Sequence, residues 1–382
     1  MRERPQVALH RCADYGPGLE AAVAAVLASL GGMTAFVRPG QRVLIKPNLL
    51  SDHAPAEAVT THPELVRSLI RQVRDCGAAP CVADSPASAV KLARVWERTG
   101  FAALCAEERV PLLNLEQAGS QRVVVEGYAF HVARPVLEAD ALINVPKVKT
   151  HALTLLTAAV KNLYGALPGY QKTHFHKDYP RPAGFGRLLH ALCRAVPPTL
   201  TVADGIVAMD GEGPAAGRPY PLGLLAASAA APALDMVLCR VLGIDPLAVP
   251  YLRPFLEADD AAGRWERIEV LGVTVTEAQA RGFRLPRATL TRWIPRPLAR
   301  ALAPLIWVRP AVDAQRCIRC GRCAAACPTA ALRLAAADAP APPELLPARC
   351  VGCCCCHEVC PVAAIRMTAS PLLRLLHREF PQ

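Results

Sequence analysis

A cysteine motif that occurs twice near the carboxyl end constrains this chain of 382 residues more than any other feature. One copy lies within CVGCCCCHEVCP, residues 350–361, where the pattern C-x2-C-x2-C-x3-C precedes a proline. The other copy has the same spacing from Cys317 to Pro328, and its CPTAAL aligns with CPVAAI of the first. Two such copies indicate an internal repeat, and we expect a pseudo-twofold axis to relate the two arms.

This repeat resembles the bacterial two-cluster ferredoxin, in which the fourth cysteine of each arm binds the cluster of the other arm. The resemblance implies two 4Fe-4S clusters held by crossed sets of ligands. The first set is Cys317, Cys320, Cys323 and Cys360, and the second set is Cys350, Cys353, Cys356 and Cys327. A structural zinc site is the alternative for any C-x2-C pair, but zinc sites close with four ligands and do not need two crossed sets.

Two further cysteines, Cys354 and Cys355, depart from the ferredoxin pattern. We interpret them as small buried side chains that fill space in the core. The alternative is that they are reserve thiols, which could take over a corner of a cluster if a ligand were lost.

The remaining cysteines and the apolar runs bear on the compartment. Six cysteines occur singly, at Cys12, Cys76, Cys81, Cys105, Cys193 and Cys239. Scattered single cysteines are typical of a reducing compartment. The first residues carry charges with no apolar core directly behind them, and no uncharged run reaches the ~20 residues of a spanning helix. We therefore expect a cytoplasmic protein without a signal peptide or a transmembrane helix.

Residues 281–312 hold the densest basic charge of a chain whose formal net charge is +11. This stretch has seven arginines, no acidic residue, and tryptophans at positions 293 and 307. We interpret it as a Pro/Arg-rich connector that packs on the large domain. Contact with an anionic membrane surface is the alternative, which we do not favour. Because no nucleic-acid-binding motif accompanies the charge, we expect no nucleic-acid partner.

Apolar runs of strand length alternate with helix-like segments in residues 1–280. RVLIK is followed by a helical pattern from Pro63, then by PCVAD, then by a helix near residues 89–99. DALINVP and TLTVAD are further candidates for buried strands. The alternation predicts an α/β fold with a mostly parallel sheet flanked by helices.

Polar residues follow four of these strands at the point where each strand ends. The strand segments that end at Lys46, Asp84 and Asp204 run into Asn48, Ser85 and Gly205, and DALINVP runs into Lys147 and Lys149. Structural turns use the same residue types, so any one of these is more often a cap than a ligand. Ligands bind outside the carboxyl ends of strands in an open parallel sheet, and the four polar ends together favour a site there.

The segment NVPKVKTHALTLLTAAVKNLYGALPG, residues 144–169, is the strongest candidate for binding a ligand. Lys147 and Lys149 alternate, so on an extended strand both side chains point the same way. Cations, hydroxyls and a helix amino terminus that converge here predict a pocket for a phosphate or carboxylate. The predicted substrate-binding residues are Lys46, Asn48, Ser85, Lys147, Lys149, Thr150, Thr154, Thr157, Lys161, Asn162, Gly211 and Gly213.

The pattern becomes helical after His151. Thr154, Thr157 and Lys161 then fall on one helix face. Gly165 is well placed to end this predicted helix.

Two weaker motifs complete the candidate site. DGEGPAAG, residues 210–217, lacks the ending of a P-loop, and we interpret it as a mobile loop of the site. His174 and His176 are at strand spacing and, with His151, could hold a transition metal. Because they have no firm carboxylate partner, we favour a polar loop or an anion contact.

Several segments in a fixed order resemble one family. They are VLIKPNLL, the helix start THPELV, NVPKVKTH, TAAVKNLYG and VADGIVAMDGEGP, ahead of a two-cluster ferredoxin. Together they resemble the uncharacterised family known as domain of unknown function 362, over about residues 5–280. The resemblance implies an architecture and site positions, but no reaction.

The resemblances and the charge pattern divide the chain into four parts. We expect an α/β domain at 1–280, the connector at 281–312, a small α+β two-cluster ferredoxin-like domain at 313–370, and a tail at 371–382.

The expected function is that of an iron–sulfur oxidoreductase. The ferredoxin module would relay single electrons to or from an anionic substrate, while Asp84, His151 or Asp204 transfers protons. The alternative is a non-enzymatic electron-transfer or assembly factor, whose anion pocket binds a metabolite or partner. Either function needs a redox partner protein or a low-potential donor.

Charges near the clusters should set their potentials. Arg316, Arg319 and Arg322 surround the first motif and favour its reduced, more negative cluster, so that cluster should have the higher potential. We expect the anion pocket to be distinct from the clusters, so that Lys161→Ala leaves both potentials unchanged.

The register of the cysteine run can be tested by single serine substitutions in anaerobically isolated protein. Wild-type protein should carry about eight iron atoms, and Cys353→Ser should lose a cluster, because Cys353 keeps the motif spacing on both sides. Cys354→Ser and Cys355→Ser should keep both clusters. Iron analysis of the three variants checks this prediction. Loss of iron from Cys354→Ser but not from Cys353→Ser would show that the assigned register of the motif is off by one residue.

Overall fold

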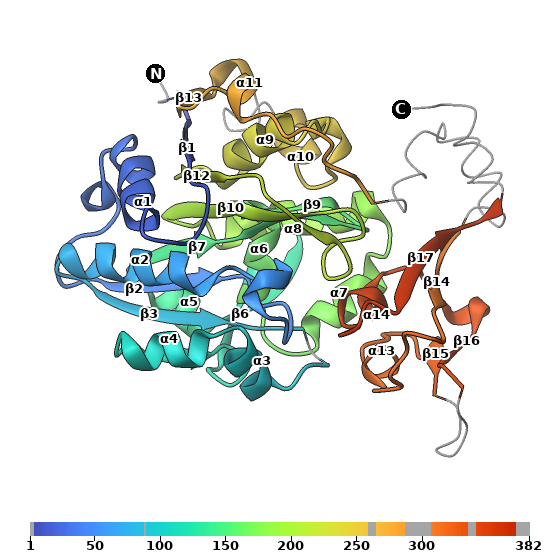
Figure 1. Ribbon diagram of the computed structural model, residues 1–382. Helices are drawn as coiled ribbons and strands as arrows, with labels where there is room; N and C mark the ends of the chain where they lie inside the picture. The colour runs from blue at the N-terminus through green and yellow to red at the C-terminus, as the bar shows by residue number, and fades with distance from the viewer. Residues whose placement is uncertain (1–3, 88, 259–264, 287–306, 335–340, 372–382) are drawn as a thin grey trace.

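A large mixed sheet forms the α/β domain in the computed structural model, which describes residues 4–87, 89–258, 265–286, 307–334 and 341–371 (Figure 1). The strand order is β13 (Glu269–Gly272), β1 (Gln6–Arg11), β12 (Leu224–Ser228), β10 (Leu200–Asp210), β7 (Ala141–Val145), β2 (Arg42–Pro47), β3 (Ala79–Asp84) and β4 (Leu112–Asn114). The run from β10 to β4 is parallel, whereas β12 is antiparallel to β10 and β1. The predicted mostly parallel sheet is confirmed.

Successive residues of the central strands bury their side chains on opposite faces of this sheet. Val43 and Ile45 of β2 belong to one apolar core, and Leu44 between them belongs to the other. The first core contains side chains of α1 (Leu19–Ala28), α2 (Pro63–Asp75) and α4 (Phe101–Glu107). The second contains side chains of α8 (Pro182–Ala195) and α9 (Ala231–Val241). Helices therefore cover both faces, and the strand ends remain available at the edges.

The expected strands and the two expected helices are present. RVLIK, PCVAD, DALINVP and TLTVAD lie in β2, β3, β7 and β10, and the helices are α2 and α3 (Leu92–Arg98). β10 continues beyond Asp204 to Asp210, where it pairs with β11 (Arg218–Tyr220).

The helix predicted directly after His151 is wrong. β8 (Lys147–His151) turns back into the antiparallel β9 (Leu155–Thr157), and α6 (Ala159–Asn162) is short. The His151 ring explains the turn, because its Nδ1 accepts hydrogen bonds from the backbone N–H groups of Leu153 (3.0 Å) and Thr154 (3.3 Å). A side chain that captures nearby N–H groups competes with helix formation.

The amino terminus of α6 is occupied by a protein carboxylate. Asp235 of α9 is fully buried and accepts from the N–H groups of Ala159 (2.7 Å) and Val160 (3.0 Å). This helix end is therefore satisfied and does not face a ligand, contrary to expectation. Gly165 also does not end a helix, because it lies within the 3-10 helix η3 (Leu163–Ala166).

The two histidines of KTHFHKD lie on a helix, α7 (Gln171–Asp178), rather than at strand spacing. His176 is buried and His174 is exposed, so the two side chains do not share one environment. Within the described ranges, no group of three or more His, Cys, Asp or Glu side chains is arranged to hold a single metal ion.

In the described residues, the small carboxy-terminal domain contains two antiparallel strand pairs, two short α-helices and the 3-10 helix η8 (Pro347–Arg349). β14 (Val308–Val312) pairs with β17 (Ile365–Ala369), and β15 (Leu332–Arg333) pairs with β16 (Glu344–Leu345). The helices are α13 (Arg322–Ala325) and α14 (Cys355–Glu358). The end of the predicted connector forms β14, and residues 287–306 of the connector lie outside the described residues.

Polar contacts join this domain to the α/β domain, where α14 lies beside α7 (Figure 1). Arg322 donates to both carboxylate oxygens of Asp52, at 2.6 and 3.0 Å. The ring Nε2 of His357 lies 3.0 Å from the carbonyl oxygen of Glu212 in the loop after β10. The small domain thus docks where the loops that follow β2 and β10 emerge from the sheet.

Candidate functional site

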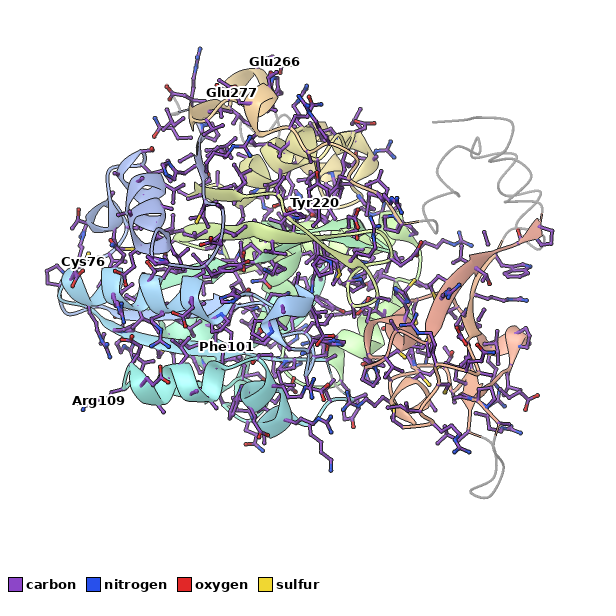
Figure 2. The ribbon with its side chains drawn as sticks, in the orientation of Figure 1. Cys76, Phe101, Arg109, Tyr220, Glu266 and Glu277 are labelled. Atoms are coloured by element: carbon purple, nitrogen blue, oxygen red, sulfur yellow. The ribbon has the colours of Figure 1, made fainter. Side chains whose placement is uncertain are left out.

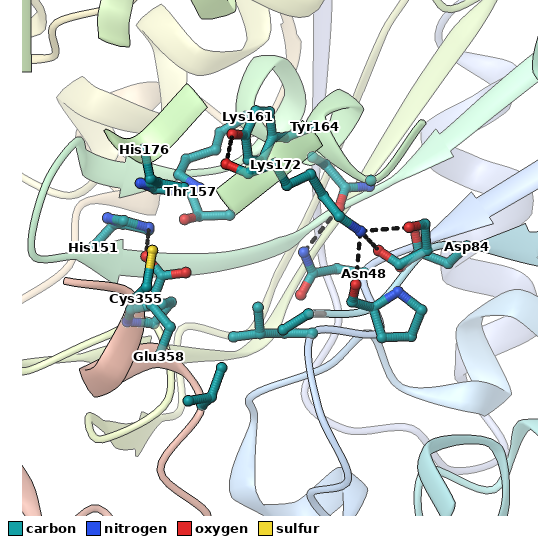
Figure 3. A pocket seen from close by; sticks show the side chains of 18 of the residues that line it. Asn48, Asp84, His151, Thr157, Lys161, Tyr164, Lys172, His176, Cys355 and Glu358 are labelled. Atoms are coloured by element: carbon teal, nitrogen blue, oxygen red, sulfur yellow. Dashed lines mark hydrogen bonds and ion pairs between the residues drawn. The ribbon is translucent and has the colours of Figure 1, made fainter. Parts of the chain in front are cut away.

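A cavity with about 100 Å3 of water-accessible space lies between the carboxyl ends of β2 and β3 and the small domain (Figure 3). We call it the anion cavity. It brings together many of the predicted site residues, namely Lys46, Asn48, Asp84, Ser85, Lys149, His151, Thr157, Lys161 and Asn162. This position agrees with the rule that open parallel sheets bind ligands at the carboxyl ends of their strands.

Four buried lysines line the anion cavity, and three of them are fully engaged by the protein. Lys46 Nζ lies 2.7 Å from Asp84 Oδ1. Lys149 Nζ donates to Asn48 Oδ1 at 2.9 Å and to the Val59 carbonyl at 2.6 Å.

The third engaged lysine is Lys172 of α7. Its Nζ donates to the carbonyl oxygens of Ser85 (2.8 Å) and Pro86 (2.7 Å) and lies 3.2 Å from Glu116 Oε1. Its positive charge is therefore shared with a carboxylate behind the cavity wall.

The fourth lysine, Lys161, forms no hydrogen bond or ion pair with any residue that the structure describes. Its Nζ lies over the rings of Tyr164 and Phe185, 5.4 and 5.8 Å from their centroids. Burial lowers the pKa of Lys161, whereas the negative charge of Glu358 raises it. Thr157 Oγ1 is also buried without a hydrogen-bond partner in the described part of the chain. A bound anion would satisfy both groups.

An imidazole–carboxylate pair from the two domains closes the cavity. His151 Nε2 lies 3.0 Å from Glu358 Oε1. Because His151 Nδ1 accepts two backbone hydrogen bonds, the hydrogen of the neutral ring is assigned to Nε2, the nitrogen that faces Glu358. Burial, reinforced by Lys161, lowers the pKa of His151 to about 3, so the ring is neutral at ordinary pH. Burial raises the pKa of Glu358, but His151 and Lys161 lower it more, and the carboxylate stays charged.

Gly165 is required by the close approach of the Lys46–Asp84 pair to η3. A Cβ atom at Gly165 would overlap both Asp84 Oδ1 and Lys46 Nζ. The missing side chain therefore allows this ion pair to lie against the cavity wall.

Lys147 and Asp204 do not line the anion cavity. Lys147 Nζ lies 2.8 Å from Asp204 Oδ2, and the hydroxyl of Tyr15 donates to Asp204 Oδ1 at 2.7 Å. Lys147 and Asp204 are fully buried and satisfied by each other and by neighbouring groups. Asp204 thus holds a structural network together and does not face the site.

Four other predicted site residues shape the loop beside the cavity without lining it. Thr150 Oγ1 donates to the Gly211 carbonyl at 2.9 Å and accepts from the Gly213 N–H at 3.2 Å. Thr154 Oγ1 donates to the Leu156 carbonyl at 3.1 Å. Pro214, which follows this glycine loop, does line the cavity.

Sequence reasoning did not assign Tyr164, Lys172, Cys355 and Glu358 to the cavity, whereas it named His176 as a possible anion contact. Lys172 and His176 lie in the KTHFHKD segment. Because this segment is a helix and not a strand, the periodicity of the helix decides which of its side chains face inward. Burial lowers the pKa of His176 to about 4, so this ring is neutral as well. Glu358 and Cys355 belong to the cysteine run, and no pattern in the sequence connects that run to His151.

Two smaller cavities in the carboxy-terminal domain are lined by cysteines. One is bounded by Cys317, Cys320, Cys323 and Cys360, and the other by Cys327, Cys350, Cys353, Cys354 and Cys356. Each combines three cysteines of one motif with the last cysteine of the other, which is the crossed grouping that the ferredoxin resemblance implies. The four motif cysteines around each cavity, as thiolates, suit an iron–sulfur cube. The assignment of individual ligands stays a prediction.

The two extra cysteines have different surroundings. Cys354 packs in the apolar core and against the second cysteine cavity, as expected of a small filler. Cys355 instead lines the anion cavity beside Glu358 (Figure 3).

The cavity is not confined to the α/β domain as expected, and its independence from the clusters stays a prediction that the structure does not test. Lys161 shares one cavity with Cys355 and Glu358, which lie between predicted cluster ligands in the sequence. Its charge acts on the small domain directly, and a change at Lys161 should alter the potential of the nearer cluster.

The arginines around the first motif also differ from one another. Arg322 is compensated by Asp52, whereas Arg316 and Arg319 are exposed. Only the latter two remain as free charges beside the first motif within the described residues.

The fold and the cysteine cavities together define a class, an α/β protein with an iron–sulfur domain docked at the loops that follow its strands. Models of two families match the chain. The domain of unknown function DUF362 matches residues 43–240, and the 4Fe-4S dicluster domain matches residues 310–367. The chain belongs to the DUF362 family, and its dicluster domain makes it an iron–sulfur electron-transfer protein with 4Fe-4S clusters.

Two known proteins are similar to parts of the chain. A thylakoid-associated protein of Synechocystis sp. is 37% identical over 249 residues, which cover 64% of this chain and 76% of that protein. The lactate racemase apoprotein from Thermoanaerobacterium thermosaccharolyticum aligns with a TM-score of 0.39 and 11% identity. That alignment covers 60% of this chain and only 54% of the racemase. Among the described helices, none is long and apolar enough to span a bilayer.

Replacing Lys161 by methionine should weaken binding of a small anion, because no other group in the cavity offers an unengaged positive charge among the described residues. Sulfate is a suitable probe, since its charge is constant across the working pH range. The expected loss is about 1.5–3 kcal/mol, typical of one hydrogen bond to a charged group. Isothermal titration calorimetry measures it.

Lys177→Met is the matched control, because Lys177 is exposed on the neighbouring α7 and should leave sulfate affinity unchanged. Burial lowers the pKa of Lys161 and of Lys149, so both lose their protons at a lower pH than exposed lysines do. Sulfate affinity should therefore fall as the pH rises into the alkaline range. Equal affinities for wild type and Lys161→Met would show that the anion binds elsewhere.

Proposed function

We propose that the protein is an oxidoreductase that passes single electrons between two 4Fe-4S clusters and a small anionic substrate in the anion cavity. The observation that supports this most is the shared wall of the cavity. Ala326, Cys355, Glu358 and Val359 of the dicluster domain line it together with the strand ends of the α/β domain. A substrate held there lies against the residues that separate the predicted cluster ligands.

The binding part of the proposal rests on charge. Lys161 offers an ammonium group and Thr157 a hydroxyl, both buried and neither hydrogen-bonded to a residue in the described part of the chain. A phosphate or carboxylate group of the substrate would accept from both, and charge-assisted hydrogen bonds of this kind are strong. The engaged Lys46 and Lys149 add positive potential to the same cavity without needing to move.

The proton-moving group that we assign is His151. Its Nε2 carries a hydrogen at the cavity wall, and Glu358 holds the ring in place from the dicluster domain. Asp84 is the other predicted proton-transfer group in the cavity, but it is paired with Lys46. Reduction of a substrate would draw electrons from the clusters and a proton from bulk water, which would reach the substrate by way of the His151–Glu358 pair.

The dicluster domain supplies the electrons, and the predicted ligands of its two clusters are the crossed cysteine sets. The clusters must exchange electrons with a redox partner protein or a low-potential donor. This partner and the cytoplasmic location stay predictions.

Turnover tests the proposal. Chemically reduced protein is mixed anaerobically with small carboxylates and phosphate esters, and the visible absorption of the oxidised clusters is followed. We expect one class of anion to reoxidise the clusters repeatedly. Lys161→Met should lose this reoxidation, because the substrate no longer binds, yet should still be reoxidised by a small artificial oxidant.

Lys177→Met should behave as wild type in the same assay. The oxidoreductase proposal fails if no small anion is turned over while the reduced protein passes electrons stoichiometrically to another protein. That outcome would favour the alternative, an electron-transfer or assembly factor whose cavity binds a regulatory anion.

A further inference from the structure

The two arms of the dicluster domain differ in their access to solvent. Cys353 and Cys356 of the second motif are buried, in the arm that contributes Cys355 and Glu358 to the anion cavity. Cys320 of the first motif is exposed. The other cysteines that the structure describes are buried or only partly exposed. An external electron carrier therefore approaches the clusters most closely at the first motif.

Two large apolar side chains are exposed at this point. Ile318 has 60% of its surface exposed and lines the first cysteine cavity. Leu334 has 47% exposed, and a Cβ atom at Gly321 would lie 3.3 Å from it, so Leu334 borders the same motif. Large apolar groups that are exposed beside a functional centre often mark a contact surface.

The charges around these side chains are positive and unpaired. Arg316 and Arg319 are exposed and form no ion pair or side-chain hydrogen bond with other described residues. The carboxylate of Asp313 does not neutralise them, because it lies 3.8 Å from Arg366 and accepts backbone N–H groups.

We propose that this first-motif face, which consists of Arg316, Ile318, Arg319, Cys320 and Leu334, docks an acidic protein that carries single electrons. The proposal rests on the proposed electron-transfer function and adds the place and the chemistry of the partner. The arginines steer an acidic surface to the face, and the apolar side chains exclude water at the point of closest approach.

The transfer itself forms and breaks no covalent bond. The reduced carrier would lose one electron at the cluster that Cys317, Cys320, Cys323 and Cys360 would hold, and the anionic substrate in the cavity would gain it by way of the cluster beside the second motif. Electrons would enter at the first motif and be used beside the second motif, so the two clusters would have separate tasks. This agrees with the different solvent exposure of the two arms.

The test is binding of the cluster-loaded protein to an oxidised flavodoxin, an acidic one-electron carrier, at low and at high ionic strength. The double variant Arg316→Glu/Arg319→Glu should bind about tenfold more weakly at low salt, and the difference should vanish at high salt, where charges are screened. The control Arg122→Glu/Arg187→Glu changes the net charge equally at exposed positions of the α/β domain and should bind as wild type does.

Iron content is measured in every variant. If the glutamates cost a cluster, Arg316→Gln/Arg319→Gln provides the same comparison with a smaller expected loss. Absence of salt-sensitive binding by the wild type, or equal weakening in both double variants, would overturn the docking face. If the face behaves as expected while no small anion reoxidises the reduced protein, the docking proposal stands and the oxidoreductase proposal fails.

Discussion

The contact between His151 and Glu358 joins the two domains at the point where the anion cavity meets the cysteine run. His151 is fixed from behind, because two backbone N–H groups hold its Nδ1 and thereby orient Nε2 toward the dicluster domain. Glu358 brings a buried carboxylate to meet it. Removing either partner would leave a polar group buried without compensation, which is costly. The same contact that docks the domain thus completes the wall of the cavity.

The charge balance of the cavity explains why it should bind an anion rather than a cation. Lys46, Lys149 and Lys172 each have protein partners, so their charges are held in place without a ligand. Lys161 has aromatic rings around it and the charge of Glu358 nearby, but no hydrogen-bond partner that the structure describes. A ligand with a negative charge would stabilise this buried ammonium group more than any other ligand, because it would supply the missing hydrogen-bond acceptor and a compensating charge.

Local patterns in the sequence predicted the elements whose geometry is local. The strand ends at Lys46 and Asp84 follow from apolar runs that stop at polar residues, and the crossed grouping of the cysteines is what the resemblance of the repeat to a two-cluster ferredoxin implies. The turn after His151 was not predictable from periodicity, because a side chain decides it by capturing backbone N–H groups. Asp204 looked like a site residue for the same reason as Asp84, yet its lysine partner on β8 satisfies it inside the fold. Cys355 and Glu358 could not be assigned to the cavity, since their role depends on how one domain docks on the other.

The redox midpoints of ligand-free protein test most directly whether the anion cavity and the clusters form one electrostatic unit. Wild type, Lys161→Met and Lys177→Met are titrated anaerobically while cluster reduction is followed by electron paramagnetic resonance. Because the Lys161 ammonium favours the reduced, more negative state of a nearby cluster, its removal should lower one of the two midpoints, with little change in the other. Lys177→Met should match wild type. Two unchanged midpoints in Lys161→Met would contradict the account, because the cavity would then be electrostatically separate from the clusters it is proposed to serve.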